Sequence, residues 1–136
     1  MVFESHHILI AAGIAVAVGG AWAVHVSTRS KARRIVRGRS PLGPAEFGGL
    51  FKTEREAALA PVVRDRLRAY IPVDPALVRP DDRLCEELQL AVIDGLDANA
   101  FVADVEKAVG VKIPAQEAEK MLTLRDIVSF VAARKQ

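Results

Sequence analysis

Residue types that support common enzyme chemistry are scarce in this chain. Cys85 is the single cysteine, which excludes an intramolecular disulfide and fits a reducing compartment. His6, His7 and His25 are the three histidines, so none follows residue 25 to activate the Cys85 thiol. A glycine-rich phosphate loop that opens a helix after a strand is also missing. We therefore expect no catalytic residues and no enzymatic activity.

Metal-ligand patterns are missing as well. The acidic pairs Asp81-Asp82 and Glu86-Glu87 lack the alternating carboxylate and carbonyl spacing of a calcium loop, so we interpret them as a solvated loop. The histidines have no cysteine or acidic partner at ligand spacing, which favours a membrane-interface role for them. We predict no metal site.

Charge is missing from one long stretch near the N-terminus. Residues 8–24 contain no charged side chain, and residues 7–26 reach the length of about 20 residues that crosses a bilayer as a helix. Trp22 near one end suits the membrane interface. We predict a transmembrane anchor over residues 1–27. A cleaved signal peptide is less favoured because no lysine or arginine precedes the apolar run, and the short chain could not surround a buried apolar helix.

Basic residues follow this apolar run closely. Positive charge stays on the cytoplasmic side, so we expect a single-pass protein of the inner membrane with the N-terminus outside and the C-terminal domain in the cytoplasm. The same side chains would attract anionic headgroups, whereas nucleic acid is disfavoured because no aromatic residues are interleaved. These predicted membrane-surface residues are Arg29, Lys31, Arg33, Arg34, Arg37 and Arg39.

Small residues recur every four positions in the apolar run, at Ala11, Ala15, Gly19 and Ala23. Such a face lets two helices approach closely. A homodimer through this face is therefore an open alternative.

Glycine and proline concentrate in residues 38–50, which we interpret as part of a basic neck and linker over residues 28–52. Phe47 and Leu50 interrupt this composition, and the sequence leaves open whether they dock on the domain. The remaining residues, 53–136, are expected to form a helical domain. Thirteen acidic against eleven basic residues from Ala60 onward make this part slightly acidic.

Periodic apolar positions predict four helices in that domain. Thr53 and Glu56 form a capping-box pattern before an apolar stripe that ends at Tyr70, and Pro61 either kinks this helix or lies in the first turn of a later one. Asp94 is the predicted N-cap of a second helix, which Gly110 ends. Residues 115–122 are expected to form a short third helix. Thr123 should cap the fourth.

The order of these helices resembles that of the acyl carrier protein family. The motifs Val73-Asp74-Pro75, Glu86-Glu87-Leu88 and Val109-Gly110-Val111-Lys112-Ile113-Pro114 are similar to the family's loop and to its turn after the second helix. The resemblance covers roughly residues 58–134. It implies an all-α fold, which we expect as a transmembrane helix, a linker and an acyl-carrier-like four-helix bundle.

The resemblance also implies a phosphopantetheine site, and here the sequence departs from the family. The family presents Asp-Ser-Leu at the start of the second helix, where the serine bears the phosphopantetheine. This chain has Asp94, Gly95 and Leu96 there, and no serine lies between Ser40 and Ser129. We therefore expect the cofactor to be absent.

Carrier domains of the family meet enzymes through acidic residues of the second helix. The corresponding partner-binding residues here would be Asp94, Asp97, Asp104 and Glu106. We expect a non-catalytic binding or scaffold module at the cytoplasmic membrane face, whose protein partner acts in lipid or acyl transfer. A functional membrane-anchored acyl carrier and an unrelated small helical anchor protein are the alternatives.

Overall fold

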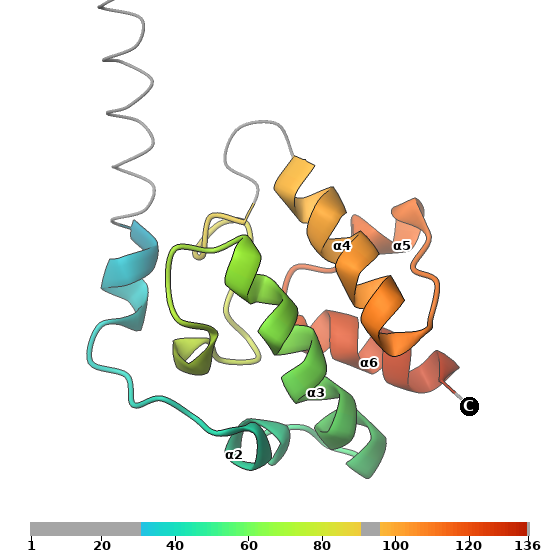
Figure 1. Cartoon of the computed structure of the whole chain (residues 1–136), viewed down its shortest axis with the longest axis horizontal. Coiled ribbons are helices and arrows are strands. Elements are labelled where there is room, and N and C mark those ends of the chain that lie inside the picture. Colours follow the sequence, from blue (N-terminus) through green and yellow to red (C-terminus); the bar gives the residue numbers. More distant parts are fainter. Residues whose placement is uncertain (1–30, 91–95, 136) are drawn as a thin grey trace, which may run out of the picture.

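The computed structural model describes residues 31–90 and 96–135, and this part of the chain is mostly helical (Figure 1). Residues 31–36 are helical, and two single-turn 3₁₀ helices, η1 and η2, follow α3. The only β feature in the described residues is one isolated bridge between Arg83 and Thr123. In chain order the elements are α2 (Pro44–Gly48), α3 (Glu54–Arg66), η1 (Leu67–Ala69), η2 (Pro75–Leu77), α4 (Leu96–Val109), α5 (Ala115–Ala118) and α6 (Leu124–Arg134).

Two predictions are wrong: the fold class with a membrane-spanning helix, and the inner-membrane location that depends on this helix. Within residues 31–90 and 96–135, no helix is both long and apolar enough to cross a bilayer. The longest, α4, has 14 residues. At about 1.5 Å per residue it is shorter than the hydrocarbon layer of about 30 Å. The span expected at residues 7–26 lies outside the described residues.

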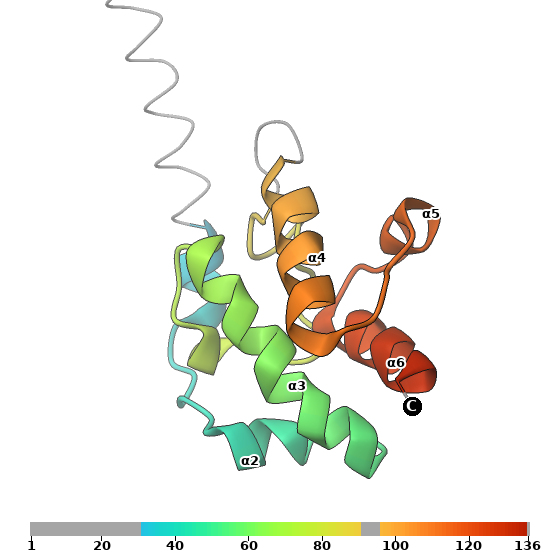
Figure 2. The same ribbon diagram turned by 45° about the vertical axis from the view of Figure 1, so that its right-hand side comes forward.

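Helix α3 lies at the centre of the domain. It packs against α2, α4 and α6, and Figures 1 and 2 show these helices around it. Its inward positions Ala60 and Val63, with Leu67 in η1, have no exposed surface. The helix continues through Pro61, so the alternative in which Pro61 lies in the first turn of a later helix is wrong.

Side chains close in sequence define the helix ends, as predicted. The Thr53 hydroxyl accepts the Glu56 backbone N–H at 3.1 Å before α3. The Thr123 hydroxyl accepts the Asp126 N–H at 3.2 Å before α6, and the Asp126 carboxylate accepts the Thr123 N–H in return. These bonds satisfy donors that a helix start leaves unpaired. Gly110 ends α4 with a φ of 73°, a conformation that favours glycine.

The stretch interpreted as a linker is packed on the domain instead. It contains α2, whose Phe47 has no exposed surface, and Phe51 follows with 9% exposure. The two rings meet edge to face at 5.4 Å. The open question about Phe47 is therefore answered, because it docks on the core, while Leu50 stays 45% exposed. The glycine and proline content predicted a linker. The residues against which these aromatic rings pack lie far away in the sequence, so local composition could not reveal this packing.

The third helix is shorter than predicted. α5 ends at Ala118 rather than at residue 122; residues 119–120 form a turn, and residues 121–122 are extended chain without regular secondary structure. The Leu122 N–H donates to the Asp126 carboxylate at 2.9 Å, and the Leu122 carbonyl accepts the Leu84 N–H at 3.0 Å. These contacts direct the chain into α6 rather than onward along α5.

Replacing Phe101 in α4 with alanine should destabilise the domain strongly. Phe101 is 1% exposed within the core, and removing a buried aromatic side chain costs about 3–5 kcal/mol. Denaturant unfolding of the full chain measures the free energy of unfolding. The control is Val62→Ala on the exposed face of α3, which should change it little. Equal effects of the two substitutions would contradict the packing of α4.

Adjacent glycines test the docking of α2. A Cβ at Gly48 would lie 2.6 Å from the Ala57 carbonyl oxygen, whereas a Cβ at Gly49 meets nothing closer than 3.4 Å. We expect Gly48→Ala to lower the melting temperature of the full chain, and Gly49→Ala to leave it unchanged or raise it. If both alanines were tolerated equally, α2 could not lie against α3 as described.

Candidate functional site

The candidate site is the outer surface of α4 and its first turn. Phe101, Val105 and Val109 point into the core with at most 1% exposure, so the opposite face of α4 is directed away from α3. Leu96 is the first helical residue. The predicted N-cap Asp94 and the position of Gly95 lie outside the described residues.

Of the predicted acidic partner-binding residues, Asp97 is exposed in the first turn of α4. An acidic side chain there is stabilised by the positive end of the helix dipole. Its charge also faces solvent, where a basic group on another protein can reach it. Asp97 therefore lies in the first turn of the helix, as predicted, and its binding to a partner stays a prediction.

Asp104 is engaged within the domain. Its carboxylate accepts a short hydrogen bond from the Tyr70 hydroxyl, and the Tyr70 ring meets Phe101 edge to face at 6.1 Å. Both residues are half-buried. Because the protonated phenol donates this hydrogen bond to the carboxylate, the pKa of Tyr70 is raised above its ordinary value. Asp104 thus joins the chain after α3 to α4, a role that the sequence did not indicate.

Glu106 also has an internal partner. Its carboxylate accepts the Ile113 backbone N–H at 2.8 Å and so closes the turn that begins at Gly110. At the same end of α4, the Lys135 ammonium donates to the Val109 carbonyl at 2.5 Å. A cation at a helix C-terminus stabilises the unpaired carbonyls there. The acidic stripe predicted on α4 is therefore divided between one exposed carboxylate and two that hold the domain together.

None of the hydroxyl groups in the described residues belongs to the first turn of α4. In the described residues they belong to Ser40, Thr53, Tyr70, Thr123 and Ser129. Two of them cap α3 and α6, as described above. The described first turn of α4, residues 96–99, has none, so it provides no acceptor for a phosphopantetheine arm.

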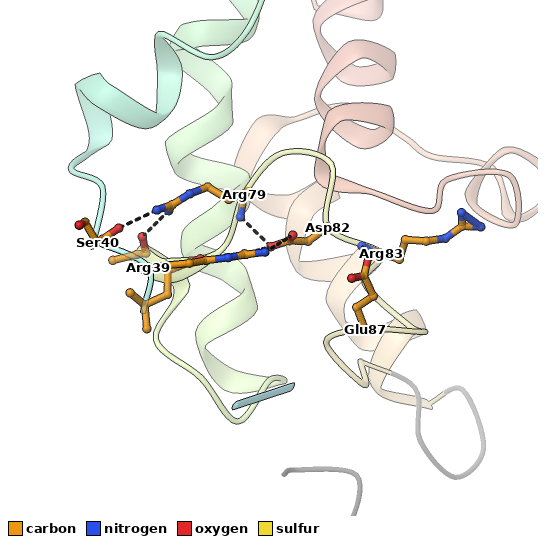
Figure 3. A network of polar contacts seen from close by, with 8 residues as sticks. Arg39, Ser40, Arg79, Asp82, Arg83 and Glu87 are labelled. Carbon is orange, nitrogen blue, oxygen red and sulfur yellow. Dashed lines mark hydrogen bonds and ion pairs between the residues drawn. The ribbon is translucent and has the colours of Figure 1, made fainter. Parts of the chain in front are cut away.

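The predicted membrane-surface residues that the structure describes differ in exposure, since one is half-buried and the others are exposed. Arg29 lies outside the described residues, and contact of these side chains with anionic headgroups stays a prediction. Arg39 is half-buried and forms a two-pronged ion pair with Asp82, at 2.6 and 3.0 Å (Figure 3). The exposed ones are Lys31, Arg33, Arg34 and Arg37.

Sequence reasoning missed the importance of Asp82, which it placed in a solvated loop. Asp82 is only 6% exposed. Besides Arg39, the backbone N–H of Arg79 donates to its carboxylate at 2.8 Å. No pattern within a few residues marks this site, because Arg39 lies far from Asp82 along the chain.

Other chemistry is sparse in the described residues. Residues 31–90 and 96–135 contain no group of three or more His, Cys, Asp or Glu side chains that could hold a metal ion. Cys85 is exposed at the surface, and desolvation by neighbouring atoms, together with the charge of Glu86, raises the pKa of its thiol, which keeps it protonated at neutral pH. A protonated thiol is a poor nucleophile, so Cys85 has the wrong surroundings for nucleophilic catalysis.

Comparison with known proteins gives a consistent set of relatives, although no protein-family model matches the chain. The acyl carrier protein of Helicobacter hepaticus is 35% identical over 65 residues, which are 48% of this chain and 82% of the relative. That of Campylobacter hominis is 33% identical over 69 residues, 51% of this chain and 84% of the relative. That of Thermosynechococcus vestitus is 36% identical over 70 residues, 52% of this chain and 78% of the relative.

Titration of Tyr70 tests the role of Asp104. Because the phenol pKa is raised above 10.0 by its hydrogen bond to Asp104, the stabilisation from this bond is complete below pH 10. It is lost as the pH rises through the higher pKa of the folded state. Tyr70 is the single tyrosine, so the tyrosinate absorbance of the full chain reports on it alone.

We expect Asp104→Ala to lower the midpoint of this titration toward 10.0, the ordinary value. The control is Glu119→Ala, which removes an exposed carboxylate and should leave the midpoint of the Tyr70 titration unchanged. An unchanged midpoint in Asp104→Ala would show that Asp104 is not the acceptor in solution.

Proposed function

The chain belongs to the acyl carrier protein family, and we propose that it serves as a protein-binding module of that family, without a phosphopantetheine arm. The observation that carries this proposal is the residue at the attachment position. Gly95 stands between Asp94 and Leu96, where the family resemblance implies a serine, and glycine has no oxygen to esterify. The relatives are named as carriers of acyl groups, and that role needs such an attachment.

The positions of the other hydroxyls support the same proposal. Thr53 and Thr123 use their oxygens to cap α3 and α6, and an ester there would remove the cap. Ser129 lies within α6, after α4 in the chain, and Ser40 lies before α2. None of these residues takes the place of a serine at the start of α4.

A binding role needs a surface rather than a reactive group. The first turn of α4 offers the exposed carboxylate of Asp97, and the rest of α4 is held rigidly by Phe101, Val105 and Val109. We propose a protein partner that presents basic side chains to this turn. Complementary charge would guide such a partner to α4 and fix its orientation. Asp104 and Glu106 would contribute indirectly, by keeping α4 in place.

A working acyl carrier is the second candidate, and the names of the relatives favour it. It requires an acceptor other than residue 95. The two candidates differ in one measurable property, which is the mass of the protein after exposure to the modifying enzyme.

Incubation with coenzyme A and a broad-specificity phosphopantetheinyl transferase should leave the intact mass of the full chain unchanged. The acyl carrier protein of Helicobacter hepaticus, treated in the same way, is the positive control for the enzyme. The matched variant is Gly95→Ser, which restores a hydroxyl beside the N-terminus of α4, where backbone N–H groups and the helix dipole favour an anionic phosphate.

Modification of the natural protein would overturn the binding-module proposal in favour of the carrier. Modification of Gly95→Ser but not of the natural protein would support the binding-module proposal, because the natural protein would then lack only the hydroxyl that the transferase modifies. If neither is modified, the natural protein still lacks the arm, and a feature other than residue 95 also keeps the transferase from modifying the variant.

A further inference from the structure

Residues 39–51, which we call the strap, are attached to the domain at both ends. At the first end, Arg39 pairs with Asp82 (Figure 3), and the Leu42 N–H donates to the Ala76 carbonyl at 2.9 Å. At the other end, the Leu50 carbonyl accepts a hydrogen bond from Arg125 at 3.2 Å. The strap therefore connects the loop that precedes α4 with the start of α6.

The middle of the strap is held by burial. The Arg64 guanidinium of α3 lies 4.4 Å above the centre of the Phe47 ring and donates to the Leu42 carbonyl at 3.0 Å. Arg64 itself is only 7% exposed. Burial and the two contacts keep its charge in place, because a desolvated guanidinium is stabilised by a ring face and a carbonyl oxygen. This part of the strap is thus a permanent part of the core.

The attachment at the first end of the strap, through Arg39, differs from that of the middle, because it depends on an ion pair rather than on apolar burial. The Asp82 carboxylate is almost fully buried and accepts both prongs of Arg39 together with the Arg79 N–H. The Arg79 guanidinium also donates to the Ser40 carbonyl at 2.7 Å. A buried carboxylate without its cation is strongly unfavourable. Arg39 and Asp82 are therefore bound to each other far more firmly than an exposed pair would be.

The neighbouring residues can bend once this pair is broken. Gly38, immediately before Arg39, has a φ of 81° and open space around its α-carbon. On its other side lies helix 31–36, whose Ala32 and Val36 are buried while its basic residues are exposed. Helix 31–36 thus has a small apolar contact with the domain and a hinge behind it.

We propose that Arg39 and Asp82 form a latch that holds helix 31–36 in one orientation on the domain. With the latch closed, the basic face of that helix and the acidic first turn of α4 keep a fixed relation. With the latch open, residues 31–41 become a tether around Gly38, while Leu42 stays bound to Arg64 and Ala76 and the core formed by α3, α4 and α6 stays intact. This inference is independent of whether the protein carries phosphopantetheine.

Hydrogen–deuterium exchange of the full chain, followed by mass spectrometry, tests the latch. In Arg39→Gln and in Asp82→Asn, peptides from residues 31–41 should exchange at least about ten-fold faster than in the natural protein. Peptides from α6 should keep their rates. The matched control is Arg37→Gln, which removes an exposed arginine two residues away and should change neither set.

Arg39→Lys adds a second variant that preserves the charge. An ammonium lacks the two-pronged geometry of the guanidinium, so the exchange rates of Arg39→Lys in residues 31–41 should lie between those of the natural protein and Arg39→Gln. Unchanged exchange in residues 31–41 of Arg39→Gln would overturn the proposal. Equal acceleration in α6, or loss of folding in either variant, would overturn it too, because the pair would then stabilise the whole domain rather than one segment.

Discussion

Burial of α3 on three sides is the constraint on which the rest of the structure depends. Ala60, Val63 and Leu67 have no exposed surface, and α2, α4 and α6 each pack against this helix. Each of these helices is too short to be stable alone in water, so its stability comes from the shared core. The hydrogen bonds at the helix ends then determine the directions in which the chain leaves the core. The surface of α4 is positioned in this way, because its inward residues can reach the core in only one register.

The features predictable from the sequence are those whose partners lie within about four residues. The caps of Thr53 with Glu56 and Thr123 with Asp126, and the helix end at Gly110, are such features, and the structure has all of them. The strap and the burial of Asp82 were not predictable in this way. Arg39 is 43 residues from Asp82, and Arg64 is 22 residues from the carbonyl it binds. A stretch rich in glycine and proline is indistinguishable by composition from a flexible linker when its contacts are this distant.

The acidic residues of α4 illustrate the same limit within the candidate site. Asp97, Asp104 and Glu106 are equivalent in the sequence, each an acid on a predicted amphipathic helix. In the structure, Asp97 is exposed, Asp104 accepts the Tyr70 hydroxyl, and Glu106 accepts the Ile113 N–H. The difference comes from the segments that approach α4 from before and after it. The charge pattern of the sequence therefore predicts that the acidic residues lie on this helix. It does not predict which of them remain exposed to a partner.

The stability of α4 is separable from the chemistry at its first turn. Phe101, Val105 and Val109 attach the helix to the core, and Lys135 and Glu106 hold its C-terminal end. None of these contacts involves residue 95. A side chain at position 95 can therefore differ without altering these core contacts of α4. The absence of the arm that we propose is thus compatible with the folded domain and with the exposed outer surface of α4.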